Sequence, residues 1–434
     1  VGAVTNAYRH ALDDALDGRP LDLLGSGEDL LGLRARRLLV VDQRLDLATE
    51  KLDSPVAVVD LAAFDANAAA LTERAAGKPI RVASKSVRVR ALLERVLRRP
   101  GWAGVMAYTL PEAIWLVREG VSDDVLVAYP TVDRAAIAEL TADERLAAAI
   151  TIMADSTDHL DVVDAVTAAG RRPDVRICLE LDTSWRPARR VHVGVRRSPV
   201  HSPQQAGALA RDVAARAGFT LVGLMAYEAH IAGVGDQPTG QAMRARAIQL
   251  MQRRAWPELL RRRGAAVRAV REHAELEFVN GGGTGSLAAT ASDRSVTEVT
   301  AGSGLFGPTL FDQYRAWRPT PSAFYGLSVV RRPAPGVATV LGGGWIASGA
   351  HGPSRLPTPW LPAGLRFKDD EGAGEVQTPL LGPAADQLRP GDRVWFRHAK
   401  AGELCEHVNQ VHLVDGDTAA PAPTYRGEGY AFLG

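Results

Sequence analysis

The chain of 434 residues carries 51 Lys and Arg against 50 Asp and Glu, which gives a formal net charge of +1. This balance offers no electrostatic attraction to nucleic acid or to an anionic membrane, so we expect neither as a partner. The sequence has no apolar run of the roughly eighteen residues that a membrane helix needs. Two cysteines, Cys178 and Cys405, are too few for a disulfide framework, and the first residues lack the apolar stretch of a secretory leader, so we expect a cytoplasmic protein.

Residues 1–50 carry Leu and Ala at spacings of three and four, which predicts a helical segment that packs on the other domains. From there to residue 283, short apolar runs alternate with helical stretches rich in Ala, Leu and Arg. Continuous apolar runs of this length are typical of parallel strands buried on both faces. The eight runs are 55–61, 80–87, 104–108, 124–130, 148–155, 176–182, 221–228 and 276–283.

Eight such alternations predict an α/β fold, a (β/α)8 TIM-type barrel over residues 51–315. A doubly wound sheet is the alternative, although it usually has fewer strands. After residue 310 the helical pattern ends, and strand-like pieces punctuated by Pro and Gly follow. We therefore expect a C-terminal all-β domain over residues 316–434.

The working residues of a β/α barrel lie at the C-terminal ends of its strands. Lys85 ends one predicted strand, where an amine can act as a nucleophile towards a carbonyl. The run Asn280–Gly285 ends another, and its backbone N–H groups can bind a phosphate with help from Thr284 or Ser286. A surface lysine and a plain tight turn are the simpler interpretations. Together, a phosphate loop and a nucleophilic lysine indicate pyridoxal phosphate.

A third feature is the segment 398–407, which places Cys405 among histidines and carboxylates. Thiolate, imidazole and carboxylate together suit a divalent metal. In an extended strand, Glu403 and Cys405 would face the same side. A free cysteine in a charged loop is the alternative. Further upstream, Arg186 or Arg197 could bind a cofactor ring or a substrate carboxylate, or could be solvated surface charge.

These motifs resemble those of the D-threonine aldolase and eukaryotic-type D-serine dehydratase family, which belongs to the pyridoxal-phosphate enzymes of the alanine racemase barrel type (fold type III). The resemblance covers about residues 50–430. It rests on Arg81-x-x-x-Lys85, on Tyr227-Glu228-Ala229-His230, on Gly281–Gly285 and on the segment 297–306. Ala83 stands where the lysine motif usually has a histidine.

The resemblance implies that Lys85 is the Schiff-base lysine and that Tyr227 and His230 take part in catalysis. It implies a phosphate site made by Gly282, Gly283, Thr284, Gly302 and Ser303. An arginine would approach the pyridine nitrogen, with Arg186 as the candidate and Arg197 as the alternate. A divalent metal, zinc or manganese, would be held by Cys405 with Glu403, and His398 or His407 could substitute.

The function expected from this resemblance is a metal-assisted lyase that acts on a D-β-hydroxy amino acid, by aldol cleavage or by dehydration. The expected partners are a small amino-acid substrate and a second copy of the chain in a homodimer. The alternative is an amino-acid racemase without metal, which needs a second acid/base from the C-terminal domain, usually a tyrosine of the partner subunit, for which Tyr325 and Tyr425 are available. A pyridoxal-phosphate carrier is a third interpretation, and the additional β domain argues against it.

Overall fold

The computed structural model describes residues 44–188 and 190–433, so most of the predicted N-terminal helical segment lies outside the described residues. Residues 44–48 are helical. The described chain falls into two units, one with residues 54–413 and 420–433 and one with residues 44–53 and 414–419. The domain boundaries at residues 50 and 315 stay a prediction.

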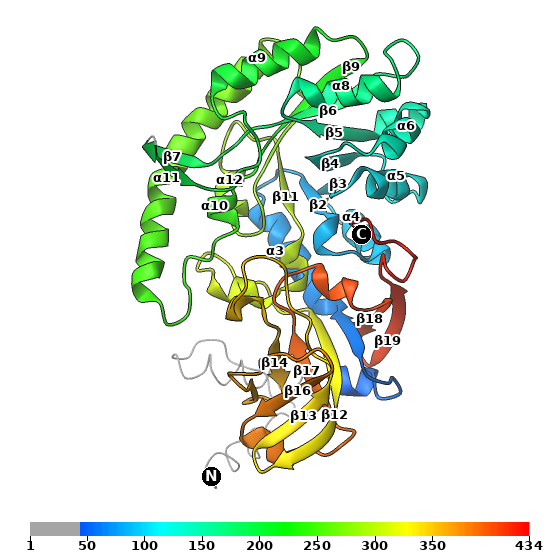
Figure 1. Ribbon diagram of the computed structural model, residues 1–434, viewed down its shortest axis with the longest axis vertical. Coiled ribbons are helices and arrows are strands. Elements are labelled where there is room, and N and C mark those ends of the chain that lie inside the picture. The colour runs from blue at the N-terminus through cyan, green and yellow to red at the C-terminus, as the bar shows by residue number, and fades with distance from the viewer. Residues whose placement is uncertain (1–43, 189, 434) are drawn as a thin grey trace. The chain divides into compact units, whose positions relative to one another are not determined.

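A closed barrel of eight parallel strands lies in the larger unit (Figure 1). The order around the barrel is β10 (Phe278–Gly281), β11 (Glu298–Ala301), β2 (Ile80–Ala83), β3 (Trp102–Ala107), β4 (Val125–Pro130), β5 (Ile150–Ala154), β6 (Val175–Glu180) and β9 (Phe219–Ala226). Side chains that include Leu126, Met153, Cys178, Val222 and Phe278 form an apolar cluster of their own. The predicted fold class is confirmed, because this barrel is accompanied by a separate, mostly β sheet.

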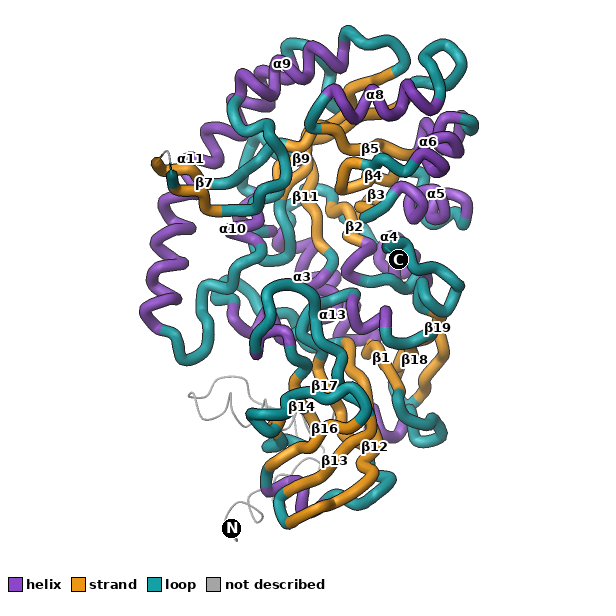
Figure 2. Tube along the Cα trace, in the orientation of Figure 1, coloured by secondary structure: helices purple, strands orange, loops and turns teal. Residues whose placement is uncertain are grey.

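Helices connect the barrel strands and pack around them, as the purple segments of Figure 2 show. Their starts are set by local capping: Thr109 accepts a hydrogen bond from the N–H of Glu112, and Ser202 forms a capping box with Gln205. The helices are α3 (Leu61–Arg74), α4 (Arg90–Leu97), α5 (Leu110–Arg118), α6 (Arg134–Thr141), α7 (Glu144–Ala149), α8 (Thr157–Val166), α9 (Pro203–Ala214), α10 (Ala229–Ala232), α11 (Ala242–Arg271), α12 (Leu287–Ala291) and α13 (Ser303–Phe306). Within the described residues, no helix has both the length and the apolar character that a membrane span requires.

The run 55–61 is not a barrel strand, which corrects the sequence-based assignment. Its strand, β1 (Val56–Asp60), pairs antiparallel with β12 (Ala323–Ala334) in the second sheet. All five residues of β1 are buried, so its pattern matches that of a parallel barrel strand. The eighth barrel strand is β11. As a consequence, Lys85 follows the first barrel strand along the chain, and the glycine loop follows the seventh.

The second sheet has nine strands among the described residues. Its main path is β15-β16-β13-β12-β1-β18-β19, and β17 pairs with both β12 and β14. The remaining bounds are β13 (Val337–Leu341), β14 (Thr358–Leu361), β15 (Arg366–Phe367), β16 (Gln377–Leu381), β17 (Arg393–Arg397), β18 (Gln410–Asp415) and β19 (Thr418–Pro423). A short hairpin of β7 (Trp185–Ala188) and β8 (Val191–Val193) follows β6.

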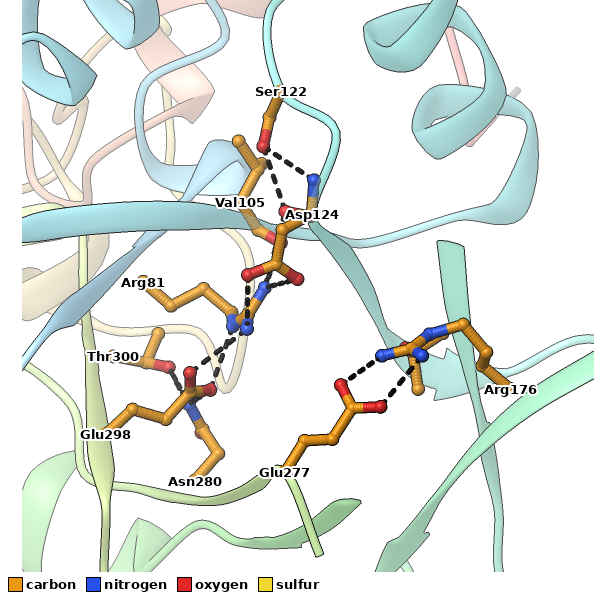
Figure 3. Close-up of polar contacts among 10 residues, drawn as sticks. Arg81, Val105, Ser122, Asp124, Arg176, Glu277, Asn280, Glu298 and Thr300 are labelled. Atoms are coloured by element: carbon orange, nitrogen blue, oxygen red, sulfur yellow. Dashed lines mark hydrogen bonds and ion pairs between the residues drawn. The ribbon is translucent and has the colours of Figure 1, made fainter. Parts of the chain in front are cut away.

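A buried arginine ties the last barrel strand to the first (Figure 3). Arg81 of β2 donates to both oxygens of Glu298 of β11, at 2.8 and 3.0 Å, and to both oxygens of Asp124, at 2.8 and 3.0 Å. Its side chain is only 2% exposed. Bidentate pairs of this kind fix the orientation of both partners. The arginine of the lysine motif therefore closes the barrel, four residues before Lys85.

Candidate active site

Lys85 leaves the C-terminal end of β2 in a single turn of 3-10 helix, Ser84–Ser86. The turn is held in place by Ser84, whose Oγ donates to the carbonyl of Met106 at 3.0 Å. The Nζ of Lys85 lies 3.2 Å from the phenolic oxygen of Tyr129, at the end of β4. Both side chains line a cavity of about 290 Å³ at the mouth of the barrel. The sequence-based placement of Lys85 at a strand end is confirmed.

The glycine loop after β10 lines the same cavity and is held in place by hydrogen bonds to Glu228. This carboxylate is fully buried and accepts from the N–H of Gly282 at 3.3 Å and from Ser286 Oγ at 2.8 Å. Arg263 compensates the charge of Glu228 at 3.1 Å. Gly282 has a φ of +82°, a conformation that favours glycine. Glu228 thus sets the path of the loop.

Two backbone groups of this loop are free to bind a ligand. The N–H groups of Thr284 and Gly285 donate no hydrogen bond within the described residues. The loop after β11 lies beside them, since Gly304 N–H and Ser303 Oγ donate to Thr284 Oγ1 at 3.1 and 3.3 Å. Gly302 lines the cavity as well. Free N–H groups and hydroxyls after the seventh and eighth strands are the usual phosphate site of such barrels.

Arg197, and not Arg186, lies at the cavity. Its guanidinium stands 5.5 Å from the ring centre of Tyr129 and 5.3 Å from that of Tyr227. Burial opposes ionisation of Tyr129, but the charges of Lys85 and Arg197 outweigh it and lower the pKa of this tyrosine. Arg186 instead lies on the β7–β8 hairpin, 2.5 Å from Asp182. The alternate arginine is therefore the one that the fold brings to the site.

The two other catalytic candidates differ in their position. Tyr227 lines the cavity, and burial raises its pKa to about 12, so its phenol is protonated at neutral pH. His230 is buried in α10 and does not line the cavity. Burial lowers the pKa of His230. The structure therefore places Tyr227 at the cavity and leaves His230 outside its lining.

The expected metal ligands are not brought together. Glu403 and Cys405 belong to a 3-10 helix, Glu403–Glu406, in which residues two apart point in different directions, so the assumption of an extended strand was wrong. Glu403 accepts from Ser348 N–H at 3.0 and 3.1 Å, while Cys405 Sγ donates to the carbonyl of Val87 at 3.3 Å. Burial raises the pKa of the Cys405 thiol to about 12.

The histidines of this segment pack against aromatic rings and do not lie beside Cys405 in a metal-binding group. His398 packs edge-on against Phe306, and burial lowers its pKa to about 3. His407 stacks on Trp345 with ring centres 5.1 Å apart. Among the described residues, no three His, Cys, Asp or Glu side chains gather as a metal-binding group. These donors do not fit a divalent metal. The cavity residues do fit pyridoxal phosphate, because the amine of Lys85 and the free N–H groups of Thr284 and Gly285 line the same cavity.

Among the cavity residues that sequence reasoning missed are Tyr129, Arg355 and Lys400. Tyr129 ends a predicted strand, and its hydroxyl at that position was an available signal. Arg355 and Lys400 come from loops of the C-terminal sheet and line the cavity with Lys85. No local pattern marks Arg355, and Lys400 lies inside the segment that was interpreted as a metal site.

Residues 59–309 match the family described as alanine racemase, N-terminal domain. The chain belongs to this family. The match begins inside β1 and extends through the barrel and both loops that line the phosphate side of the cavity. No curated protein sequence matches the chain.

Several solved structures share the fold of this chain. D-threonine aldolase from Filomicrobium marinum superposes with a TM-score of 0.71 at 20% identity, covering 87% of this chain and 96% of that one. D-threo-3-hydroxyaspartate dehydratase from Delftia sp. HT23 gives a TM-score of 0.64 at 20% identity, with 87% and 98% covered. Alanine racemase from Corynebacterium glutamicum gives 0.52 at 20% identity, with 79% and 90% covered.

Proposed function

We propose that this protein is a pyridoxal-phosphate-dependent lyase that acts on a small D-β-hydroxy amino acid. The observation that carries the proposal is the position of Lys85. Its amine reaches into one cavity with the free N–H groups of Thr284 and Gly285, which suit a phosphate. The likeness to a D-threonine aldolase and a D-threo-3-hydroxyaspartate dehydratase supports the reaction class.

Pyridoxal phosphate, when bound, withdraws electrons from the α-carbon of an attached amino acid. The residues of this chain would bind and orient the cofactor and the substrate, and they would move protons. Thr284, Gly285 and Ser303 would hold the phosphate, and Arg197, which lies beside Tyr129 and Tyr227, would contact the cofactor ring. Lys85 holds the cofactor at rest and then carries the proton of the α-carbon, with the hydroxyl of Tyr129 at 3.2 Å as its hydrogen-bond partner.

The proposal contains no metal-dependent step. Glu403 and Cys405 are hydrogen-bonded to Ser348 and Val87, and the cavity is lined by cations, which repel a divalent ion. We therefore expect chelators to leave turnover unchanged.

The racemase alternative needs a second acid/base, and the two tyrosines named for it lie outside this cavity. Tyr325 and Tyr425 are 0% and 1% exposed, and neither lines the cavity. Tyr325 stacks on Trp345 and Phe396 inside the C-terminal sheet. Tyr425 packs edge-on against Trp115. The lyase is preferred because the aldolase and the dehydratase superpose with higher TM-scores than the alanine racemase.

The test is a substrate panel on the protein loaded with pyridoxal phosphate. D- and L-serine and D- and L-threonine are assayed for pyruvate, 2-oxobutyrate, glycine and aldehyde, with and without a chelator. We expect product from a D-isomer only, lost in Lys85→Ala and kept in Lys368→Ala, whose lysine is exposed and does not line the cavity. Racemisation of an amino acid without any of these products would contradict the proposal.

A further inference from the structure

The cavity has an unbalanced charge. Lys85 and Arg197 from the barrel line it together with Arg355 and Lys400 from the C-terminal sheet, and among the described residues no Asp or Glu lines it. The loops after β10 and β11 would hold the cofactor phosphate, and Lys85 and Arg197 lie beside Tyr129. Arg355 and Lys400 therefore lack a role in holding the cofactor.

Arg355 is the less compensated of the two cations. Its Nε and Nη1 atoms are buried and have no hydrogen-bond partner. Its backbone is fixed, since its carbonyl accepts from Ala347 N–H at 2.8 Å at the end of the turn Pro353–Arg355. Two buried N–H groups without acceptors are costly, and an anion that accepts from them removes that cost. The planar fork of arginine matches a carboxylate in particular.

Lys400 is held in place but only partly neutralised. Its Nζ donates to Ser348 Oγ at 2.9 Å, and Glu403 lies at 3.9 Å. Glu403 in turn accepts from the N–H of Ser348. Burial lowers the pKa of Lys400, Glu403 opposes that shift, and the charges of Lys85 and Arg355 add to it. Lys400 and Arg355 thus lie near enough to act on one anion.

We propose that Arg355 and Lys400 form a carboxylate-binding site on the wall that the C-terminal sheet contributes to the cavity. The site takes a carboxylate of the amino-acid substrate, either the α-carboxylate or one on the side chain. This inference rests on the proposed function for the identity of the ligand, while the cationic site itself depends only on the contacts above.

The experiment measures binding without turnover. Propionate and succinate, which carry carboxylates but no amine, are titrated into the protein loaded with pyridoxal phosphate, and calorimetry gives their dissociation constants. Arg355→Gln and Lys400→Gln should each weaken carboxylate binding by about tenfold or more, the loss expected of a charge-assisted hydrogen bond. Arg366→Gln, whose guanidinium is 64% exposed and outside the cavity lining, should leave it unchanged.

Two further readouts separate the alternatives. The affinity of the unloaded protein for pyridoxal phosphate should be unchanged in both variants, and an equal loss there would assign the cations to the cofactor phosphate and overturn the inference. Unaltered carboxylate binding would also overturn it. With D-serine and D-3-hydroxyaspartate as substrates, a rise in KM for both locates the α-carboxylate at the site, and a rise for the latter alone locates the side-chain carboxylate. The substrate panel could yield no product while carboxylates still bind in a way that depends on Arg355. That result would refute the proposed lyase and leave the carboxylate site standing.

Discussion

Glu112 is fully buried at the start of α5, where its Oε2 accepts from the N–H of Tyr108 at 2.7 Å. Burial raises its pKa from 4.5 to about 7. Between these values the folded state holds a proton that the unfolded state has lost. The free energy of unfolding therefore falls as pH rises through this window, by up to about 1.4 kcal/mol per pH unit for one such group.

Glu112→Gln should reduce this pH dependence, because glutamine has no proton to lose. Urea unfolding at about pH 5 and about pH 7 measures it. Glu180, whose pKa burial also raises to about 7, should keep part of the slope in the variant. Glu144→Gln, at an exposed position of α7, is the matched control and should retain the full slope. An identical slope in Glu112→Gln and wild type would show that Glu112 is ionised when buried.

The place of a residue in the site was predictable where its type and its position at a strand end were enough to indicate it. Lys85 and the glycine run end strands in the sequence, and the structure brings both to one cavity. Arg197 could not be separated from Arg186, because the choice depends on how the chain from β6 to α9 folds back. Arg355 and Lys400 reach the cavity only through long-range packing of the C-terminal sheet, which leaves no local signal.

At the scale of the elements, the expected phosphate site depends on close contact between the end of β2 and the loop after β11. A Cβ on Gly302 would lie 2.7 Å from the carbonyl oxygen of Ala83, two residues before Lys85. Gly302→Ala should therefore displace one of the two segments and lower the affinity for pyridoxal phosphate by about tenfold, equivalent to about 1.4 kcal/mol and within the usual cost of overpacking.

Titration of the unloaded variant with pyridoxal phosphate measures this effect. Gly264→Ala is the control, because a Cβ there meets no atom closer than 3.7 Å and lies in the interior of α11, where alanine is favoured. It should bind the cofactor normally and be as stable as wild type or more so. Wild-type cofactor affinity in Gly302→Ala would mean that the loop after β11 does not form the site.

The elements themselves were largely predictable, since seven of the predicted runs are barrel strands. The exchange of β1 for β11 has a physical cause: a strand covered on both faces shows the same apolar run in a parallel barrel and in an antiparallel sheet. The 3-10 helix at Glu403 was missed because four residues carry too little periodicity to distinguish it from a strand.

At the scale of the whole molecule, we propose a two-fold homodimer. A groove of about 950 Å³ opens beside Lys85 and Lys400, and its lining includes Val132, Ile346 and Leu433, which are 67%, 52% and 72% exposed. Exposed apolar side chains gathered in one groove are typical of an interaction site. Sedimentation should show a dimer that Ile346→Asp weakens and that Leu341→Asp, at an exposed site outside the groove, does not. A fully active monomer would refute the assembly.

The central claim is that Lys85 carries the cofactor. The most direct measurement is borohydride reduction of the protein loaded with pyridoxal phosphate, followed by proteolysis and mass spectrometry of the labelled peptide. We predict that the label lies on Lys85 alone. Lys85→Ala should take up no label, although pyridoxal phosphate should still bind weakly through its phosphate. Label on Lys400 or on any other lysine, or full labelling of Lys85→Ala, would contradict the account.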